Sequence, residues 1–107
     1  RTRMLEALTF ISTELHRAFK PFWHVSSDAE KARAAQVVDG HLQYVAGRLH
    51  SDYLFGTGPS VADFYLFVML LWARRFDVDV PPVLAALRDR LAARPAAQMA
   101  MRYEGIA

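Results

Sequence analysis

Apolar residues recur every three or four positions through most of the chain, which is the spacing of one face of a helix. In the N-terminal part this repeat passes through Leu5, Leu8, Ser12, Leu15 and Phe19. Pro21 then ends or kinks the helix, because proline lacks a backbone N–H and clashes with the preceding turn. The pattern therefore predicts a first long helix that closes just before Pro21.

A second helix is predicted after a break at Val25-Ser-Ser-Asp-Ala-Glu30. Either Ser26 or Ser27 can cap this helix, and acidic residues follow in its first turn. The helical spacing then continues through Ala34, Val38, Leu42, Val45 and Leu49. The segment 50–59, which includes Gly56-Thr-Gly58, has the composition of a connecting loop and its turns.

Three more helices are predicted in the C-terminal half. One opens at Ser60 and ends near Phe76, with Arg74 and Arg75 at the end where basic side chains favour the helix dipole. After Pro81-Pro82 a shorter amphipathic helix runs through Val83, Leu84, Leu87 and Leu91, and a last short helix covers residues 96–103. No alternation of period two bounded by turns stands out. The sequence thus predicts an all-α domain of four or five helices.

Asp63 stands directly before a nearly unbroken apolar run, Phe64 to Ala73, where an ionised carboxylate is costly to bury. Ser60-Val-Ala-Asp63 has the form of a capping box. In that motif Ser60 accepts the N–H of Asp63, and the Asp63 carboxylate accepts the N–H of Ser60. We expect Asp63 to satisfy backbone donors at the buried start of this helix.

Composition narrows the range of functions. The 107 residues are 53% hydrophobic and carry a net charge of +2, which fits one compact domain. There is no dense basic block for nucleic acid, and the longest apolar run is about half of a membrane span. The chain has no cysteine, which fits a reducing compartment, and its four histidines lack the close spacing of a helical zinc site. The chain begins in mid-pattern at Arg1, so we expect either a piece of a larger protein or an artificial boundary rather than a natural start.

The segment Ser60-Val-Ala-Asp-Phe-Tyr-Leu-Phe67 resembles the capping-box helix in the C-terminal domain of glutathione transferases. Thr13-Glu-Leu-His-Arg-Ala-Phe-Lys-Pro-Phe22 is similar to the first long helix of the bacterial, beta-class enzymes. Further matches lie in Leu42–Val45, Leu71–Ala73 and Arg94-Pro95. The resemblance covers essentially the whole chain. It departs from the family at Pro59, where a bulky apolar residue commonly precedes the capping serine.

The resemblance implies a cytoplasmic, bacterial detoxification enzyme that is a homodimer and uses glutathione as co-substrate, without a metal. It also implies that a thioredoxin-like N-terminal domain, absent from this chain, belongs to the intact protein and grips most of the glutathione. The activity implied is conjugation of the glutathione thiolate to small hydrophobic electrophiles. This chain alone should not catalyse it.

Candidate site residues follow from the same resemblance. His16 matches the histidine that points toward the glutathione sulfur, where an N–H donor stabilises the thiolate. Thr9 matches a polar position that reaches glutathione bound to the neighbouring subunit, Thr13 lies on the same edge of the helix, and Arg17 matches a basic position beside the site. From the residues alone, His16 could equally be a hydrogen-bonded boundary residue, and Arg17 a solvated charge.

Aromatic residues suggest a hydrophobic co-substrate pocket. Trp72 matches a tryptophan that lines this pocket in the family, and Phe19, Phe22 and Trp23 are further candidates. Aromatic residues at helical spacing are also typical of a core, and Met69, Met99 and Met101 are interpreted as packing. We expect His16 and Trp72 to open into one shared cleft.

Two other functions remain open. The same helical domain recurs as a non-catalytic interaction scaffold, but a scaffold has no need of a histidine beside a pocket. A related thiol-disulfide transferase would differ in a residue of the missing N-terminal domain.

Overall fold

The computed structural model describes residues 2–95 and residue 98, and it confirms the predicted all-α class. These residues form no strand, and Tyr53 and Gly56 make an isolated β-bridge. The helical elements in chain order are α1 (Thr2–Phe10), the π-helical turn η1 (Ile11–Leu15), α2 (His16–Ala18), the 3₁₀ turn η2 (Lys20–Trp23), α3 (Asp28–Gly47), α4 (Val61–Arg75) and α5 (Pro82–Ala92). The predicted helix over residues 96–103, with Met99 and Met101, lies outside the described residues.

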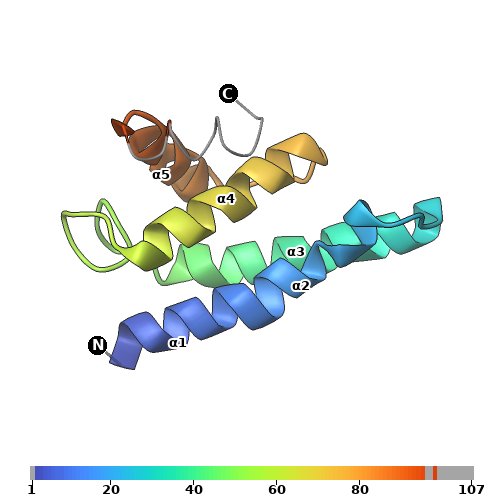
Figure 1. The fold of residues 1–107 in the computed structure, drawn as a ribbon, viewed down its shortest axis with the longest axis horizontal. Helices are drawn as coiled ribbons and strands as arrows, with labels where there is room; N and C mark the ends of the chain where they lie inside the picture. The colour runs from blue at the N-terminus through green and yellow to red at the C-terminus, as the bar shows by residue number, and fades with distance from the viewer. Residues whose placement is uncertain (1, 96–97, 99–107) are drawn as a thin grey trace.

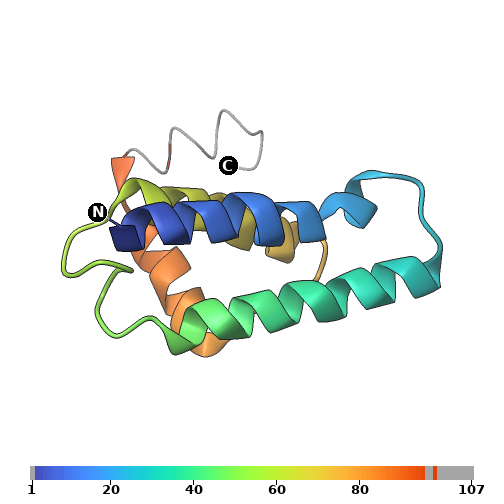
Figure 2. The same ribbon diagram turned by 90° about the horizontal axis from the view of Figure 1, so that it is seen from below.

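The helices α1 and α3 run side by side in opposite directions (Figures 1 and 2). The turn η2 and the residues after it connect them at one end of the molecule. Helix α4 packs against α1, η1 and α5. Helix α4 thus contacts both the first and the last of the described helices, and it forms the centre of the bundle.

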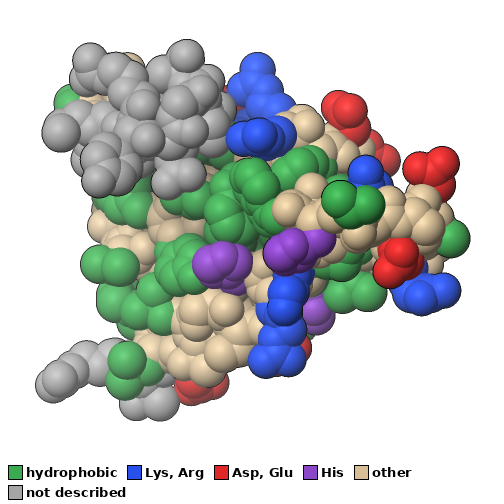
Figure 3. Space-filling view, turned by 45° about the vertical axis from the view of Figure 1, so that its right-hand side comes forward, with side chains coloured by type: hydrophobic (Ala, Val, Ile, Leu, Met, Phe, Trp, Pro, Cys, Tyr) green, Lys and Arg blue, Asp and Glu red, His purple; other side chains and the backbone are tan. Residues whose placement is uncertain are grey.

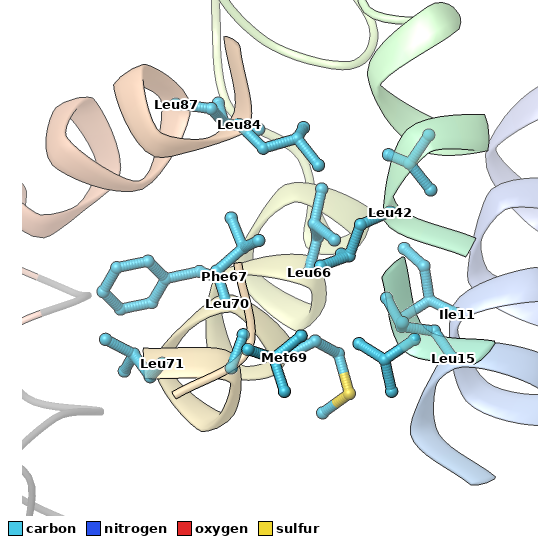
Figure 4. Close-up of a cluster of buried hydrophobic side chains, with 14 of the residues drawn as sticks. Ile11, Leu15, Leu42, Leu66, Phe67, Met69, Leu70, Leu71, Leu84 and Leu87 are labelled. Carbon is cyan, nitrogen blue, oxygen red and sulfur yellow. The ribbon is translucent and has the colours of Figure 1, made fainter. Parts of the chain in front are cut away.

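The buried core is built around α4. Its side chains Leu66, Phe67 and Leu70 are fully buried, and they meet Leu15 from η1 and Leu42 from α3. Figure 4 shows Leu84 and Leu87 of α5 reaching the same cluster from the other side. Burying side chains of this size contributes about 1.5–3 kcal/mol each, so the apolar run that follows Asp63 contributes substantially to stability.

The first long helix is continuous from α1 through α2, but it contains a π-helical turn that the sequence did not reveal. The backbone N–H of His16 donates to the carbonyl of Ile11, five residues earlier. Since this turn holds an extra residue, Ile11 takes the inner position that the repeat assigned to Ser12, and Ser12 is exposed. The predicted stripe is also wrong at Leu5, which is 65% exposed, whereas Leu15 and Phe19 are buried as expected.

The N-caps of α3 and α4 are at residues predicted from the sequence. Ser60 and Asp63 form the predicted capping box at the start of α4, and Asp63 is fully buried. For α3 the cap is Ser27, whose hydroxyl accepts the N–H of Glu30 while Glu30 accepts the N–H of Ser27. Ser26 instead donates its hydroxyl to the carbonyl of Pro21, at 2.9 Å. The structure thus selects Ser27 from the two predicted caps.

Candidate functional site

His16 is the first residue after the π-helical turn, and its side chain is exposed. π-Helical turns inside α-helices occur frequently at functional sites. The Nδ1 atom of His16 lies 2.7 Å from the hydroxyl oxygen of Tyr65, on α4. A hydrogen bond between residues that are 49 positions apart therefore fixes the imidazole against the central helix.

The ring of Trp72 also packs against the imidazole of His16. Trp72 follows Tyr65 by seven residues, about two turns, so both side chains emerge from the same face of α4. The ring centroids of His16 and Trp72 lie 5.1 Å apart at an interplanar angle of 71°, and those of His16 and Tyr65 lie 6.0 Å apart at 76°. The structure thus brings His16 and Trp72 together, as expected.

An aromatic cluster extends from this point toward the end of α4. Trp23 contacts Trp72 edge-on at 5.1 Å and Phe76 at 4.9 Å, and Phe22 stacks on Phe76 at 5.0 Å. Trp23 is 43% exposed, so part of this cluster is open surface. Figure 3 shows this side of the molecule, where histidine and basic side chains border exposed hydrophobic ones. The cluster is defined here as Phe19, Phe22, Trp23, Trp72 and Phe76.

Phe19 lies on the inner side of the cluster, and Arg75, which is not a member, lies at its outer edge. Phe19 is fully buried and packs against Trp72 at 5.6 Å, so it lies behind the tryptophan. Arg75 is exposed and holds its guanidinium 4.8 Å from the centroid of the Trp23 ring. A cation over an indole face is attracted by the ring quadrupole. The positive charge of Arg75 therefore sits at the rim of the cluster.

Thr9, Thr13 and Arg17 are all exposed on the first helix, near His16 in the sequence. The Thr13 hydroxyl donates to the carbonyl of Thr9 at 2.6 Å, and the Ser12 hydroxyl donates to the same carbonyl at 3.2 Å. These hydroxyls are thus used locally by the backbone around the π-helical turn. The structure places the three residues on the same helix as His16 and records no contact that assigns them a ligand.

A hollow of about 380 Å³ lies elsewhere, at the other end of α1. It is lined by residues of α1, the end of α3 and the following loop, among them Phe10, Tyr44, Arg48, His50 and Phe55. None of its lining residues belongs to the His16 site. His16 is exposed and Trp72 is half-buried where the two rings meet, so the pair reaches the molecular surface. The shared cleft expected between them stays a prediction.

The described residues lack two features, a metal-binding group and a helix that could span a membrane. Their His, Asp and Glu side chains form no group of three or more that could hold a metal ion. Within the same residues, every helix is too short or too polar to cross a bilayer.

Sequence reasoning missed Tyr65 and Phe76. Tyr65 and Trp72 are seven residues apart in a helix that the sequence did predict, so they share a helical face. This relation was the available signal that Tyr65 faces the same neighbour as Trp72. Phe76 follows Trp72 by four residues, so the same relation applied to it, although it is the residue that closes α4.

The fold and these residues point to a known class of protein. The chain matches the model of the glutathione S-transferase C-terminal domain over residues 5–95. It is 33% identical over 99% of its length to glutathione S-transferase GstA of Escherichia coli O157:H7. The chain therefore belongs to the glutathione S-transferase C-terminal domain family, as its resemblance predicted.

Solved structures agree with this assignment. A glutathione transferase from Methylococcus capsulatus str. Bath superposes with a TM-score of 0.89 over 100% of this chain, at 42% identity. A sphingomonad glutathione S-transferase complexed with glutathione superposes with a TM-score of 0.82 over 100% of this chain, at 40% identity. The chain spans 55% of each of these two proteins and 55% of the Escherichia coli relative.

Proposed function

We propose that the intact protein is a glutathione S-transferase, and that this chain supplies its hydrophobic co-substrate surface and one residue of its thiol site. The observation that carries the proposal is the pairing of an exposed imidazole with an aromatic surface, His16 against Trp72 at 5.1 Å. The names of the relatives and the glutathione bound in the sphingomonad structure support the same activity. A scaffold would require neither feature.

The chemical role proposed for His16 is hydrogen bonding to the glutathione sulfur. Tyr65 contacts Nδ1, so we assign the contact with the ligand to the other ring nitrogen, Nε2. An N–H donor beside the sulfur stabilises the thiolate over the thiol. The thiolate then attacks an electrophilic carbon, a carbon–sulfur bond forms, and the leaving group departs with its electron pair.

The hydrophobic electrophile would lie on the exposed part of the aromatic cluster. Trp23 and Trp72 offer ring faces and edges for an apolar or aromatic substrate, and such surfaces suit hydrophobic ligands. Phe19 contributes by supporting Trp72 from behind, because it is itself fully buried. Holding both reactants in contact converts an encounter in solution into a reaction within one complex.

The partners proposed are those of the family. A thioredoxin-like N-terminal domain of the same protein would hold most of the glutathione and close the open side of the His16 surface. A homodimer would bring Thr9 of one subunit toward glutathione of the other, with Thr13 and Arg17 on the same exposed helix edge. We propose a cytoplasmic protein that detoxifies small electrophiles.

The test is the steady-state kinetics of the intact protein with glutathione and a chlorodinitrobenzene. Losing one hydrogen bond to a charged sulfur should lower kcat/KM of His16→Ala by about 10- to 100-fold. The melting temperature should change little, because the side chain is exposed. His24→Ala is the matched control, since His24 is an exposed histidine that directly follows η2, eight residues after His16.

The alternatives give different results in this experiment. Unchanged turnover of His16→Ala would remove the role of the histidine. Turnover by the wild type of a glutathione mixed disulfide, with no conjugation, would identify a thiol-disulfide transferase. Wild-type protein without either activity would favour an interaction scaffold.

A further inference from the structure

We propose that Tyr65 is a positioning residue that fixes the tautomer of His16, so that the ring proton resides on Nε2 and faces outward. The inference rests on the proposed function for its catalytic consequence, but the tautomer itself is a property of the protein without substrate. It is carried by the 2.7 Å separation between Tyr65 Oη and His16 Nδ1.

The direction of this hydrogen bond follows from the chemistry of the two groups. A phenol is a better donor than acceptor, because its oxygen lone pair is delocalised into the ring. A neutral imidazole has one N–H and one acceptor nitrogen. If Tyr65 donates its hydroxyl hydrogen to Nδ1, the imidazole proton must be on Nε2, since the bond made by one ring nitrogen sets the state of the other.

The position of Tyr65 makes it a firm reference point for the imidazole. It is the fifth residue of α4, two residues after Asp63, which forms the capping box with Ser60. The residues after it, Leu66 and Phe67, are fully buried. The backbone that carries Tyr65 is thus anchored at both its cap and its core, whereas His16 is exposed and depends on contacts for its orientation.

Trp72 restrains the same ring without competing for Nδ1. Its indole lies across the imidazole at 71°, so it limits rotation of His16 by packing. The indole has only one polar group, an N–H donor, and therefore cannot supply the proton acceptor that would select the other tautomer. The hydrogen bond of Tyr65 thus selects the tautomer of His16, and packing against Trp72 restrains the orientation of the imidazole ring.

The consequence for the reaction is specific. An imidazole with its proton on Nε2 presents an N–H donor to a thiolate. The other tautomer presents a lone pair, which repels the thiolate. A protein that kept only this tautomer would begin each cycle with the productive donor already in place.

The first measurement is a long-range proton–nitrogen correlation spectrum of the intact protein with isotope-labelled histidine, in which His16→Gln assigns the His16 signals. The nitrogen shifts of the wild type should show Nε2 protonated and Nδ1 as acceptor. In Tyr65→Phe the shifts should move toward a mixture of tautomers. Tyr44→Phe is the matched control, because Tyr44 is an exposed tyrosine of α3 outside this site.

The second measurement is steady-state kinetics of the same variants. Tyr65→Phe keeps the ring that packs near His16 and removes only the hydroxyl. We expect kcat to fall about 3- to 10-fold, the range of one neutral hydrogen bond, while KM for glutathione stays near the wild-type value. The melting temperature, measured in parallel, identifies any part of this loss that comes from unfolding.

The outcomes separate this inference from the proposed function. Wild-type shifts that place the proton on Nδ1, or unchanged shifts in Tyr65→Phe, would overturn the inference even if His16→Ala abolishes conjugation. Altered shifts in Tyr65→Phe, together with unaffected turnover in His16→Ala, would support the tautomer and overturn the proposed role of the histidine.

Discussion

The carboxylate of Asp63 accepts the backbone N–H of Leu54 at 2.8 Å, nine residues earlier in the chain. Its other oxygen accepts the N–H of Ser60 at 2.8 Å and the Ser60 hydroxyl at 2.7 Å. One fully buried side chain thus caps α4 and also ties the preceding loop to it. This second role explains why an acidic residue stands at the start of the most apolar helix: its charge is compensated by three donors.

Replacing Asp63 by alanine should destabilise the protein strongly. Buried donors left without a partner cost about 1–3 kcal/mol each, so the loss of the carboxylate should lower the free energy of unfolding by about 2–4 kcal/mol. Asp63→Asn should lose less, because its carbonyl oxygen still accepts one N–H. Denaturant unfolding of the intact protein measures both changes.

Glu30 provides a matched control for this prediction. It occupies the same position in the capping box of α3, but its side chain is exposed. Water can replace the lost acceptor there, so Glu30→Ala should destabilise less than Asp63→Ala. Equal losses in the two variants would contradict the idea that burial makes the α4 box the stronger one.

Acidification should remove the contribution of Glu30. Hydrogen bonds from the backbone and then the side chain of Ser27 hold the pKa of the Glu30 carboxyl below its ordinary value of 4.5. A carboxyl whose pKa is lowered by folding stabilises the folded state above its unfolded pKa, and this stabilisation is lost as the pH falls through the folded pKa. The stability difference between wild type and Glu30→Gln should therefore be constant near neutral pH and shrink below pH 4.5. Urea unfolding at successive pH values measures it, and a difference that does not change with pH would refute the prediction.

Local signals in the sequence were sufficient for the helices after the first. Ser60 and Pro82 mark where α4 and α5 begin, because capping and the missing N–H of proline act within a few residues. Ser26 and Ser27 were not separable from sequence, since both precede the acidic turn. In the structure Ser26 donates to the carbonyl of Pro21, and Ser27 forms the capping box with Glu30.

The inner face of the first helix was predicted only in part. A regular repeat assumes 100° per residue, and the π-helical turn at Ile11–Leu15 breaks that assumption. No residue type signals such a turn. Ile11, Leu15 and Phe19 are buried in the core, so the inner face of this helix follows its packing against the other helices.

The site was predictable to the extent that it lay in one segment or in the family resemblance. His16 and Trp72 came from the resemblance, and the structure brings them together. Their link through Tyr65 joins residues 49 positions apart, and helical periodicity cannot show which faces of two helices meet. The exposure of Trp23 and the burial of Phe19 were equally hidden, because they depend on side-chain packing.

Two glycines should respond to alanine in opposite directions. Gly40 lies inside α3, is exposed, and has no atom within 4 Å of an added Cβ, so Gly40→Ala should raise the free energy of unfolding by about 0.5–1 kcal/mol through lower backbone entropy of the unfolded chain. Gly56 also has space for a Cβ, but its φ of +123° is a conformation that alanine rarely adopts, and its carbonyl accepts the N–H of Tyr53. Gly56→Ala should therefore lower the free energy of unfolding by about 1–3 kcal/mol. Since the two substitutions add the same methyl group without a clash, thermal unfolding of both variants separates helix entropy from backbone strain, and shifts of the same sign would contradict the loop conformation at Gly56.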